Sequence, residues 1–379
     1  MFVLIRSLCC GLGLFLISIV TAALSAQQIL EIEQDYPAIR VEQVVAGLGI
    51  PWGMAFLSPG QLLLTERAGI VRLLDMENGS IVNLSGTPEV VAEGQGGMLD
   101  VAIGPNYADE GWIYFTYAKR SRSEAATTLA RARLAGHRLL DWEDLLVTDS
   151  ATDGRQHFGS RIAFDDEGHV FFGVGDRGER YMAQDLSNHV GTIMRLNLDG
   201  SVPADNPFVG INNARDEIWS YGHRNPQGLL FDRVTNRLWS IEHGPRGGDE
   251  INLIIRGRNY GWPVISHGKE YWGPLSIGEG TSKAGMEQPH KVYIPSIAPG
   301  SLIIYRGNAF PQWRGNLFAG ALKLRHLNRI TLSDSGQVID EERILEDLGE
   351  RIRALVQGPE DWIYFSTDNG RILRIRPVK

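Results

Sequence analysis

The chain has little cysteine, and the two cysteines that it has lie together near the N-terminus. Of 379 residues, only Cys9 and Cys10 are cysteines, and both lie in an apolar run from Leu8 to Val20. If this run belongs to a signal peptide that is removed, the mature chain has no thiol, which excludes a disulfide framework and cysteine chemistry. Walker loops, nucleophile elbows and zinc-ligand spacings are absent as well.

Residues 1–26 have the features of a secretory signal peptide. Arg6 precedes the apolar run and small residues follow it, which is the order of a positive region, an apolar region and a cleavage site. Ala23-Leu24-Ser25 would place the cut after Ser25, and we adopt a cut after Ala26 as the boundary. A permanent membrane anchor is the alternative, but the run is short for a spanning helix, which needs about 20 apolar residues. We therefore predict a periplasmic or secreted protein without stable membrane insertion after cleavage.

Excess positive charge is also lacking. The formal net charge is −8, and because Arg6 is the only charged residue of the predicted signal, its removal leaves −9. No basic block stands out, which argues against nucleic acid as a partner. With 43% hydrophobic residues, the mature part can bury a large core, and no other run is long enough to cross a membrane.

Long helical periodicity is hard to find, and repeated strand and turn signals take its place. Apolar strands separated by Gly, Asp or Asn turns form six weakly similar units: residues 52–75, 97–118, 160–178 with 191–200, 226–244, 301–332 and 353–377. Because no such unit can bury both of its faces alone, the units must stack around an axis. The pattern predicts an all-β chain with a single six-bladed β-propeller domain over residues 27–379. Val41 to Val45 would complete the final blade, and a β-sandwich pair or a solenoid is the alternative.

Polar side chains and backbone-shaping residues are concentrated between Tyr221 and Trp262. This stretch contains GHRNPQG (Gly222 to Gly228), EHGPRGGDE (Glu242 to Glu250) and NYGW (Asn259 to Trp262). Glycine permits close approach of the backbone to a ligand, and proline fixes the chain locally. The combination indicates rigid loops that aim carbonyls and polar side chains at a bound molecule. In a propeller, loops from different blades converge at one end of the axis.

His157 and Asp176 are a candidate acid–base pair. His157 lies in a polar loop just before a predicted strand, and Asp176 follows the next strand. A neutral imidazole could take a proton from a substrate hydroxyl near neutral pH, with the carboxylate orienting the ring. The alternative is a hydrogen-bonded structural histidine and a turn-forming aspartate.

Lys323, Arg351 and Arg353 form a second candidate set. Arg351 and Arg353 are two residues apart, so on a strand they face the same way, and Lys323 follows the apolar FAGAL run. Converging cations bind carboxylates or phosphates. A solvated charged edge is the alternative.

Asp249, Glu250 and the carbonyls of the Gly244-Pro245 turn are a third candidate set. Calcium prefers carboxylates and main-chain carbonyl oxygens in a loop. The spacing of an EF-hand loop is absent, so the signal is weak, and turn hydrogen bonding by the acidic side chains is the alternative.

Taken together, the motifs resemble the soluble quinoprotein sugar dehydrogenases, in particular the aldose sugar dehydrogenase branch. The resemblance covers nearly all of the predicted mature chain, and many motifs in one order make it specific. They are WGMAF, GQGGMLDVAIGP, HFGSR, GDRG with AQDLSNHVGTIMRLNLDGSVP, EIWSYGHRNPQGL, EHGPRGGDEIN, NYGWP, GNLFAGALK, and GERIR with STDNGR.

The resemblance implies a six-bladed propeller that binds pyrroloquinoline quinone (PQQ) and calcium and passes electrons from an aldose sugar to an external acceptor. By motif position, His157 resembles the catalytic base and Asp176 the carboxylate that orients it. The residues that resemble quinone-binding residues are Gln95, Arg224, Asn225, Lys323, Arg351 and Arg353.

The resemblance also implies two calcium sites. Gly244 and Pro245 resemble the carbonyl donors to the calcium that touches the quinone, and Glu250 and Tyr260 resemble ligands of a second, structural calcium. The expected reaction is oxidation at the anomeric carbon to a lactone.

One residue departs from the pattern of the glucose-specific branch. Gln156 stands before His157, where that branch has an acidic residue, which favours a broader range of aldoses. A calcium-dependent lactonase-type propeller and a non-catalytic binding propeller are the competing interpretations, because a fold alone does not fix a function.

Overall fold

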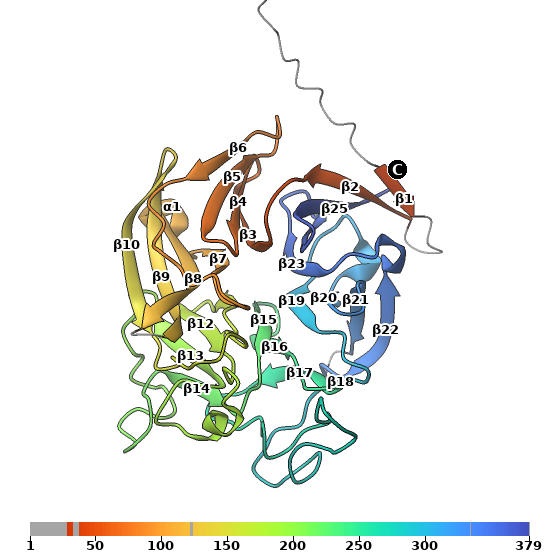
Figure 1. Cartoon of the computed structure of the whole chain (residues 1–379). Coiled ribbons are helices and arrows are strands. Elements are labelled where there is room, and N and C mark those ends of the chain that lie inside the picture. The colour runs from red at the N-terminus through yellow and green to blue at the C-terminus, as the bar shows by residue number, and fades with distance from the viewer. Residues whose placement is uncertain (1–28, 33–37, 122–123, 334, 379) are drawn as a thin grey trace, which may run out of the picture.

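Six antiparallel sheets surround a central axis in the computed structural model (Figure 1). The structure describes residues 29–32, 38–121, 124–333 and 335–378. The predicted signal peptide, residues 1–26, lies outside the described residues. The prediction of an all-β, six-bladed propeller is confirmed. Among the described residues, no helix combines the length and apolar character needed to cross a membrane.

Each of the first five blades is a sheet of four strands taken in chain order. The strands are β3 (Pro51–Ser58), β4 (Gln61–Glu66), β5 (Ile70–Asp75) and β6 (Ile81–Leu84); β7 (Met98–Ile103), β8 (Trp112–Ser121), β9 (Glu124–Ala135) and β10 (Arg138–Val147); β11 (Ile162–Phe164), β12 (His169–Val174), β13 (Thr192–Asn197) and β14 (Ile218–Tyr221); β15 (Pro226–Asp232), β16 (Arg237–Glu242), β17 (Asp249–Ile254) and β18 (Lys291–Tyr293); and β19 (Pro299–Ile304), β20 (Leu317–Ala321), β21 (Leu327–Leu332) and β22 (Val338–Ile344).

The helical segments are short and connect the strands. They are the α-helix α1 (Tyr107–Glu110) and the 3-10 helices η1 (Arg180–Gln184), η2 (Pro311–Trp313) and η3 (Glu346–Leu348).

The sixth blade is built from both ends of the chain. It contains β23 (Ile352–Gln357), β24 (Ile363–Thr367) and β25 (Arg371–Pro377), followed by β2 (Ile39–Val45) and β1 (Ile29–Ile32). β2 pairs antiparallel with β25, so the prediction that the N-terminal strand completes the final blade is confirmed. The pairing closes the ring, because each first strand then contacts the first strand of the next blade.

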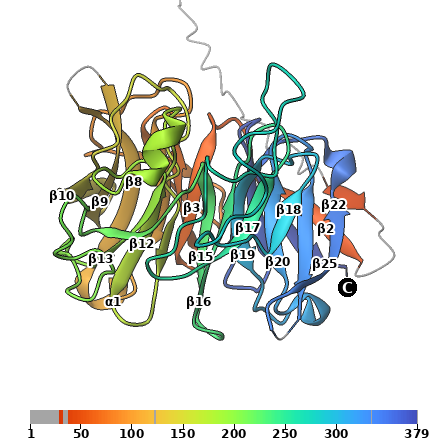
Figure 2. The ribbon, with the colours of Figure 1, turned by 90° about the horizontal axis from the view of Figure 1, so that it is seen from below.

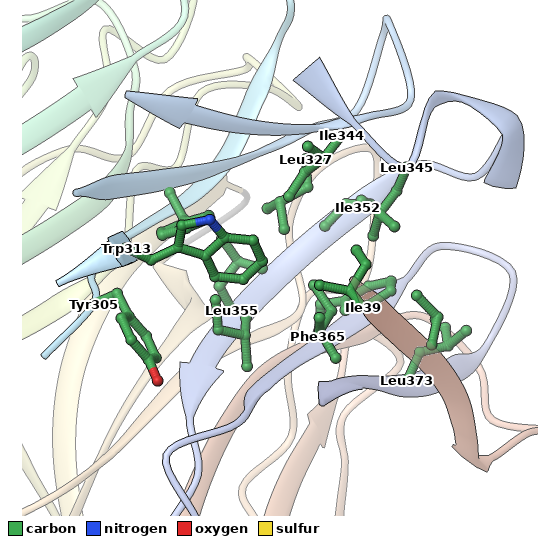
Figure 3. Close-up of a cluster of buried hydrophobic side chains, with 14 of the residues drawn as sticks. Ile39, Tyr305, Trp313, Leu327, Ile344, Leu345, Ile352, Leu355, Phe365 and Leu373 are labelled. Atoms are coloured by element: carbon green, nitrogen blue, oxygen red, sulfur yellow. The ribbon is translucent and has the colours of Figure 1, made fainter. Parts of the chain in front are cut away.

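The interface between the fifth and sixth blades is an apolar cluster that includes residues of the closing strand (Figure 3). Ile39 of β2 is fully buried and belongs to the same cluster as Phe365 and Leu373 of the C-terminal strands. Burial of apolar surface stabilises by roughly 25 cal/mol per Å², so closure of the ring depends strongly on this cluster.

Arg161 occupies the axis of the propeller and bonds to several blades at once. Its guanidinium donates to Asp100 Oδ1 in β7 (2.6 Å), to the Gly300 carbonyl in β19 (2.9 Å) and to the Gln227 carbonyl in β15 (3.2 Å). Its Cζ also lies 4.4 Å from the ring centroid of Trp52 in β3. Both members of the Arg161–Asp100 ion pair are buried, so the pair links the blades beneath the site described below.

Replacing Ile39 with alanine tests the importance of the closing strand. We expect Ile39→Ala to lower the free energy of unfolding by about 2–5 kcal/mol, because a fully buried side chain leaves a cavity in the interface. Ile211→Ala is the matched control, because Ile211 is 54% exposed and should change the free energy by less than about 0.5 kcal/mol. Denaturant unfolding measures both, and similar small losses in the two variants would contradict the closure.

Candidate active site

His157 and Asp176 meet at one end of the propeller, on loops that flank β11 and β12. The His157 Nδ1 and Asp176 Oδ1 atoms are 2.6 Å apart, and both residues are buried. His157 has a φ of 57°, which places it in the left-handed region. The adjoining backbone is tight, because a Cβ on Gly175 would lie 2.4 Å from the His157 carbonyl oxygen. Glycine at position 175 is therefore what lets the two loops come together.

Hydrogen bonds from two other segments and from a nearby backbone amide hold this pair. The His157 N–H donates to Gln95 Oε1 at 2.8 Å. The Trp262 indole Nε1 donates to Asp176 Oδ2 at 2.8 Å, and the Gly178 N–H donates to Asp176 Oδ1 at 2.9 Å. With the carboxylate fixed in this way, the Nδ1 side of the imidazole faces Asp176 and Nε2 points away from it. This arrangement can present an unprotonated Nε2 to a ligand.

The surroundings keep the imidazole neutral and the carboxylate charged. Burial lowers the pKa of His157, and the nearby Arg224 cation acts in the same direction, while Asp176 opposes them. Burial alone would raise the pKa of Asp176, but the hydrogen bond and charge of His157, together with Arg224, bring that pKa below its ordinary value. A neutral base beside a charged carboxylate is the state that proton abstraction requires.

Arg224 and Asn225 lie just before β15, beside the pair. Arg224 Nη1 donates to the Gly244 carbonyl at 2.6 Å and to the His243 carbonyl at 3.0 Å. Asn225 Oδ1 accepts the Gly159 N–H at 3.2 Å. Arg224 Nε and Asn225 Nδ2 are buried donors that have no hydrogen-bond partner within the described ranges. Buried donors without partners are costly, so these two atoms are suited to an acceptor-rich ligand.

A cavity of about 320 Å³ opens at the same end of the axis. Its walls come from loops and strand ends around the whole ring and contain aromatic, amide and guanidinium groups: Trp52, Arg67, Gln95, Phe158, Gln227, His243, Ala298, Leu322, Arg351, Arg353 and Asp368. The cavity has the size and the mixed lining of a small-molecule site.

The two arginines of the predicted cation set line this cavity, but they are not free. Arg353 Nη2 and Arg351 Nε donate to Asp368 Oδ2 at 3.0 and 2.7 Å. Lys323 is exposed and is not among the residues that line the cavity. The structure therefore brings together Arg351 and Arg353 with a carboxylate between them, and leaves the Lys323 side chain outside.

All four predicted metal-binding residues line a second, much smaller pocket. It has a volume of about 20 Å³, and its lining includes Gly244, Pro245, Glu250 and Tyr260, together with Glu242. A space of this size holds one water-sized particle. The structure thus gathers around one pocket the residues that the sequence assigned to two calcium sites.

The oxygen atoms of this pocket differ in the hydrogen bonds that they already accept and in their pKa. The Pro245 carbonyl accepts a hydrogen bond from Ser296 Oγ at 3.1 Å. The Tyr260 hydroxyl accepts the Ile255 N–H at 2.9 Å and so faces β17. Burial, with the neighbouring Glu242 carboxylate, raises the pKa of Glu250 to about 8. A buried carboxylate beside a partly buried one, as Glu242 and Glu250 are here, is the kind of site that a cation stabilises.

Several residues of the site were not identified from the sequence. Trp262 was part of a quoted motif but had no assigned role, although its NYGW context placed it among the polar loops. Asp368 lies in STDNGR, and only its position opposite two arginines shows its importance. His243 lines both cavities and donates from Nε2 to the Pro299 carbonyl at 2.7 Å. These contacts join segments far apart in sequence, so spacing could not reveal them.

The protonation of His157 can be measured directly. We expect the His157 ring to titrate below its usual pKa of about 6.5, and to titrate lower still in Asp176→Asn, because the carboxylate is the group that raises this pKa. NMR titration of the ring signals, assigned by their loss in His157→Gln, measures both values. A pKa above 6.5 in the unsubstituted protein, or no decrease in Asp176→Asn, would contradict this geometry.

Comparison with known proteins identifies the family of this chain. The profile of the glucose/sorbosone dehydrogenase family matches residues 48–374. The aldose sugar dehydrogenase YliI of Escherichia coli K12 is 40% identical over 354 residues, which is 89% of this chain and 93% of that protein.

Solved structures show the same relationship. The soluble aldose sugar dehydrogenase of Escherichia coli in its apo form superimposes with a TM-score of 0.87 at 38% identity, covering 90% of this chain and 100% of that one. The PQQ-bound aldose sugar dehydrogenase of Streptomyces coelicolor gives a TM-score of 0.73 at 26% identity, covering 92% of this chain and 98% of that one. The resemblance drawn from the motifs is confirmed, and the chain belongs to the glucose/sorbosone dehydrogenase family.

Proposed function

We propose that this protein is a PQQ- and calcium-dependent aldose dehydrogenase that oxidises the anomeric carbon of a sugar to a lactone. The observation that carries the proposal is the buried His157–Asp176 pair, joined at 2.6 Å, whose residues adjoin Gln95 in the wall of a cavity of about 320 Å³. We also propose that residues 1–26 are removed during export to the periplasm and that residues 27–379 form one catalytic domain.

The donors around the cavity fit a planar quinone that carries several carboxylates. Arg351 and Arg353 line one side, and guanidinium groups bind carboxylates in bidentate geometry. Arg224, which lines the smaller pocket, and Asn225, which is in neither lining, supply buried donors at Nε and Nδ2 that have no partner in the described structure. With Gln95, these residues would hold the cofactor. Lys323 would join them if its side chain turned inward from its exposed position.

The small pocket fits a hard cation. Glu250 and the carbonyls of Gly244 and Pro245 are oxygen donors around a space of about 20 Å³, and calcium prefers such donors. We assign Tyr260 a place in the wall of this pocket, because its hydroxyl is engaged with the backbone of β17. The bound cation would offset the charge of Glu242 and Glu250.

His157 moves the proton in this reaction. Nδ1–H is held by Asp176, so Nε2 takes the proton of the anomeric hydroxyl as general base. PQQ, when bound, supplies the acceptor for the hydride that leaves the same carbon. The Asp176 carboxylate stabilises the imidazolium formed on His157. The hydrogen bond from the Trp262 indole N–H in turn stabilises the charged carboxylate. An external electron acceptor would complete the turnover.

The residue before the base supports a broad range of aldoses. Gln156 is exposed, and its backbone carbonyl accepts a hydrogen bond from the Arg177 guanidinium. The neutral amide of Gln156 cannot select one arrangement of sugar hydroxyl groups through a fixed negative charge. We therefore propose that several aldoses are substrates. Activity confined to glucose would contradict this part of the proposal.

Dye-linked oxidation of several aldoses tests the reaction. We expect the purified cofactor-free protein to be inactive, and to oxidise more than one aldose only when PQQ and calcium are both added. Activity without PQQ would contradict the proposal. Calcium-dependent hydrolysis of lactones without quinone would instead establish a lactonase, and sugar or quinone binding without turnover would establish a binding propeller.

Substitution of the base gives a second test. We expect His157→Asn to lower kcat by about 10²- to 10⁴-fold, the usual contribution of a general base, while the affinity for PQQ changes little. His137→Asn is the matched control, because His137 is exposed on the second blade and should retain full activity. A His157→Asn variant with more than a tenth of the original kcat would exclude the assigned role.

The cation site can be tested without turnover. We expect calcium to raise the thermal unfolding midpoint of the protein, and Glu250→Gln to lose most of that rise because the amide cannot balance the cation. Glu89→Gln should retain the rise, because Glu89 is exposed. An equal calcium response in all three proteins would contradict the assignment of Glu250.

A further inference from the structure

A cavity between the fourth and fifth blades lies at the end of the propeller opposite the candidate active site. It has a volume of about 340 Å³ and shares none of its described lining residues with the two pockets above. β15 begins directly after Asn225 and runs to Asp232, which lines this cavity. In Figure 2 the turn between β15 and β16 is at the bottom of the view, and the coil of η1, which follows Asp176, is at the top.

Positive charge dominates this cavity. Its described lining contains three arginines, Arg237, Arg306 and Arg314, and one carboxylate, Asp232. The other described lining residues are uncharged, so the lining has an excess of two positive charges, in a chain whose net charge is −8. We call it the arginine cavity. A cleft lined by one sign of charge raises the local concentration of ions of the opposite sign.

The single carboxylate is already fully engaged. Both Asp232 oxygens accept from Arg306 Nη2 at 2.7 Å, and the Thr235 hydroxyl and the Val234 N–H also donate to Asp232. Asp232 is buried, so this ion pair is a fixed link between the fourth and fifth blades. It neutralises only one of the three arginines.

Arg237 has no counter-charge in the described part of the chain. It stands opposite Asp232 in the pairing of β15 with β16, so both side chains leave the same face of the sheet, but the carboxylate is bound to Arg306. Arg237 makes neither an ion pair nor a hydrogen bond with the described residues. A Cβ on Gly336 would lie 2.6 Å from Arg237 Nη1. The guanidinium therefore reaches the fifth blade, where glycine leaves room for it.

Arg306 and Arg314 add donors from the fifth blade. Arg306 Nε is buried and has no hydrogen-bond partner within the described ranges, and Gly315, 3.7 Å from Arg306 Nη1 by the position of a Cβ, places no side chain there. Arg314 is exposed and donates to the neutral Oδ1 of Asn308. A buried donor without a partner is costly, so an acceptor-rich ligand would stabilise this arrangement.

We propose that the arginine cavity binds the phosphate group of a small phosphate-bearing molecule through Arg237, Arg306 and Arg314. A phosphate monoester carries a charge of about −1.5 to −2 at pH 7, which matches the excess of two positive charges. Guanidinium groups bind phosphate oxygens in bidentate geometry. The volume of about 340 Å³ is that of a small-molecule site and leaves room for the rest of the ligand. The proposal does not depend on the reaction at His157.

The charge of the cavity favours a phosphate over other anions. A single carboxylate would leave one of the two surplus positive charges without a counter-charge. A nucleic acid needs a basic stripe that follows its backbone, whereas the arginines here surround one cavity of an acidic protein. A small dianion is therefore the ligand that this cavity fits.

Calorimetric titration with inorganic phosphate and with glycerol 3-phosphate tests the site. We expect both to bind the full-length, cofactor-free protein at one site, with glycerol 3-phosphate binding more tightly because its carbon chain fills more of the cavity, and glycerol alone not to bind. Arg237→Ala and Arg314→Ala should each weaken binding by about tenfold, the effect of one charge-assisted hydrogen bond. Because Arg314 is exposed, its variant should fold normally.

Two control variants locate the bound anion. Arg138→Ala should bind as the unsubstituted protein does, because Arg138 is exposed on the second blade. Arg351→Ala should also retain binding, because Arg351 lines the other large cavity. Loss of binding in Arg351→Ala, with binding unchanged in Arg237→Ala and Arg314→Ala, would place the phosphate in that cavity and overturn the proposal.

The two phosphate probes separate the sources of the ligand. Tighter binding of glycerol 3-phosphate would identify an organic phosphate, and tighter binding of inorganic phosphate would identify the free ion; both support the site. Absence of binding by either probe at millimolar concentration would overturn it, whatever the protein does to sugars.

Discussion

The buried Arg161–Asp100 ion pair is the constraint on which the arrangement of the site depends. Its guanidinium, in the loop before β11, bonds to β7, β15 and β19 and lies over Trp52 of β3. Burial raises the pKa of Asp100, and Arg161 opposes that shift. Loss of one partner would leave an uncompensated charge in the axis, which is far more costly than the net value of the pair. The first strands of the blades are thereby held at fixed spacing, and the loops that end them keep their positions.

Above this pair, the candidate site is a product of loop geometry more than of any one strand. His157 comes from the third blade, Arg224 from the start of the fourth and Arg353 from the sixth. The close approach of these loops depends on glycine at a few positions, as at Gly175. Arg224 connects the two parts of the site. Burial lowers the pKa of His157 and the Arg224 cation lowers it further, and the same guanidinium donates a hydrogen bond to the Gly244 carbonyl. His157, the larger cavity and the small pocket lined by Glu242 and Glu250 are thus parts of one connected network.

Repeated strand signals and ring closure were predictable because they are local or periodic features. The alternation of apolar residues predicted six blades. An N-terminal strand outside the six repeated units could then pair only with the open edge of the final blade. The proximity of His157 and Asp176 was also predictable, because loops on one end of a propeller converge. The axial position of Arg161 was not, since nothing in HFGSR distinguishes a buried arginine from an exposed one. Lys323 and Asp368 were not predictable for the same reason. Lys323 follows the FAGAL run but is exposed, and Asp368 lies in a turn but forms ion pairs with Arg351 and Arg353. Only the packing of distant loops determines either outcome.

The central claim is that the cavity at the axis holds the redox cofactor beside His157. The most direct measurement is a crystal structure of the protein prepared with PQQ and calcium. We predict planar density for the quinone in the cavity lined by Gln95, Arg351 and Arg353, and a cation at the Gly244 and Pro245 carbonyls. A quinone bound elsewhere on the protein, or a cavity that contains only solvent at saturating PQQ, would contradict the account.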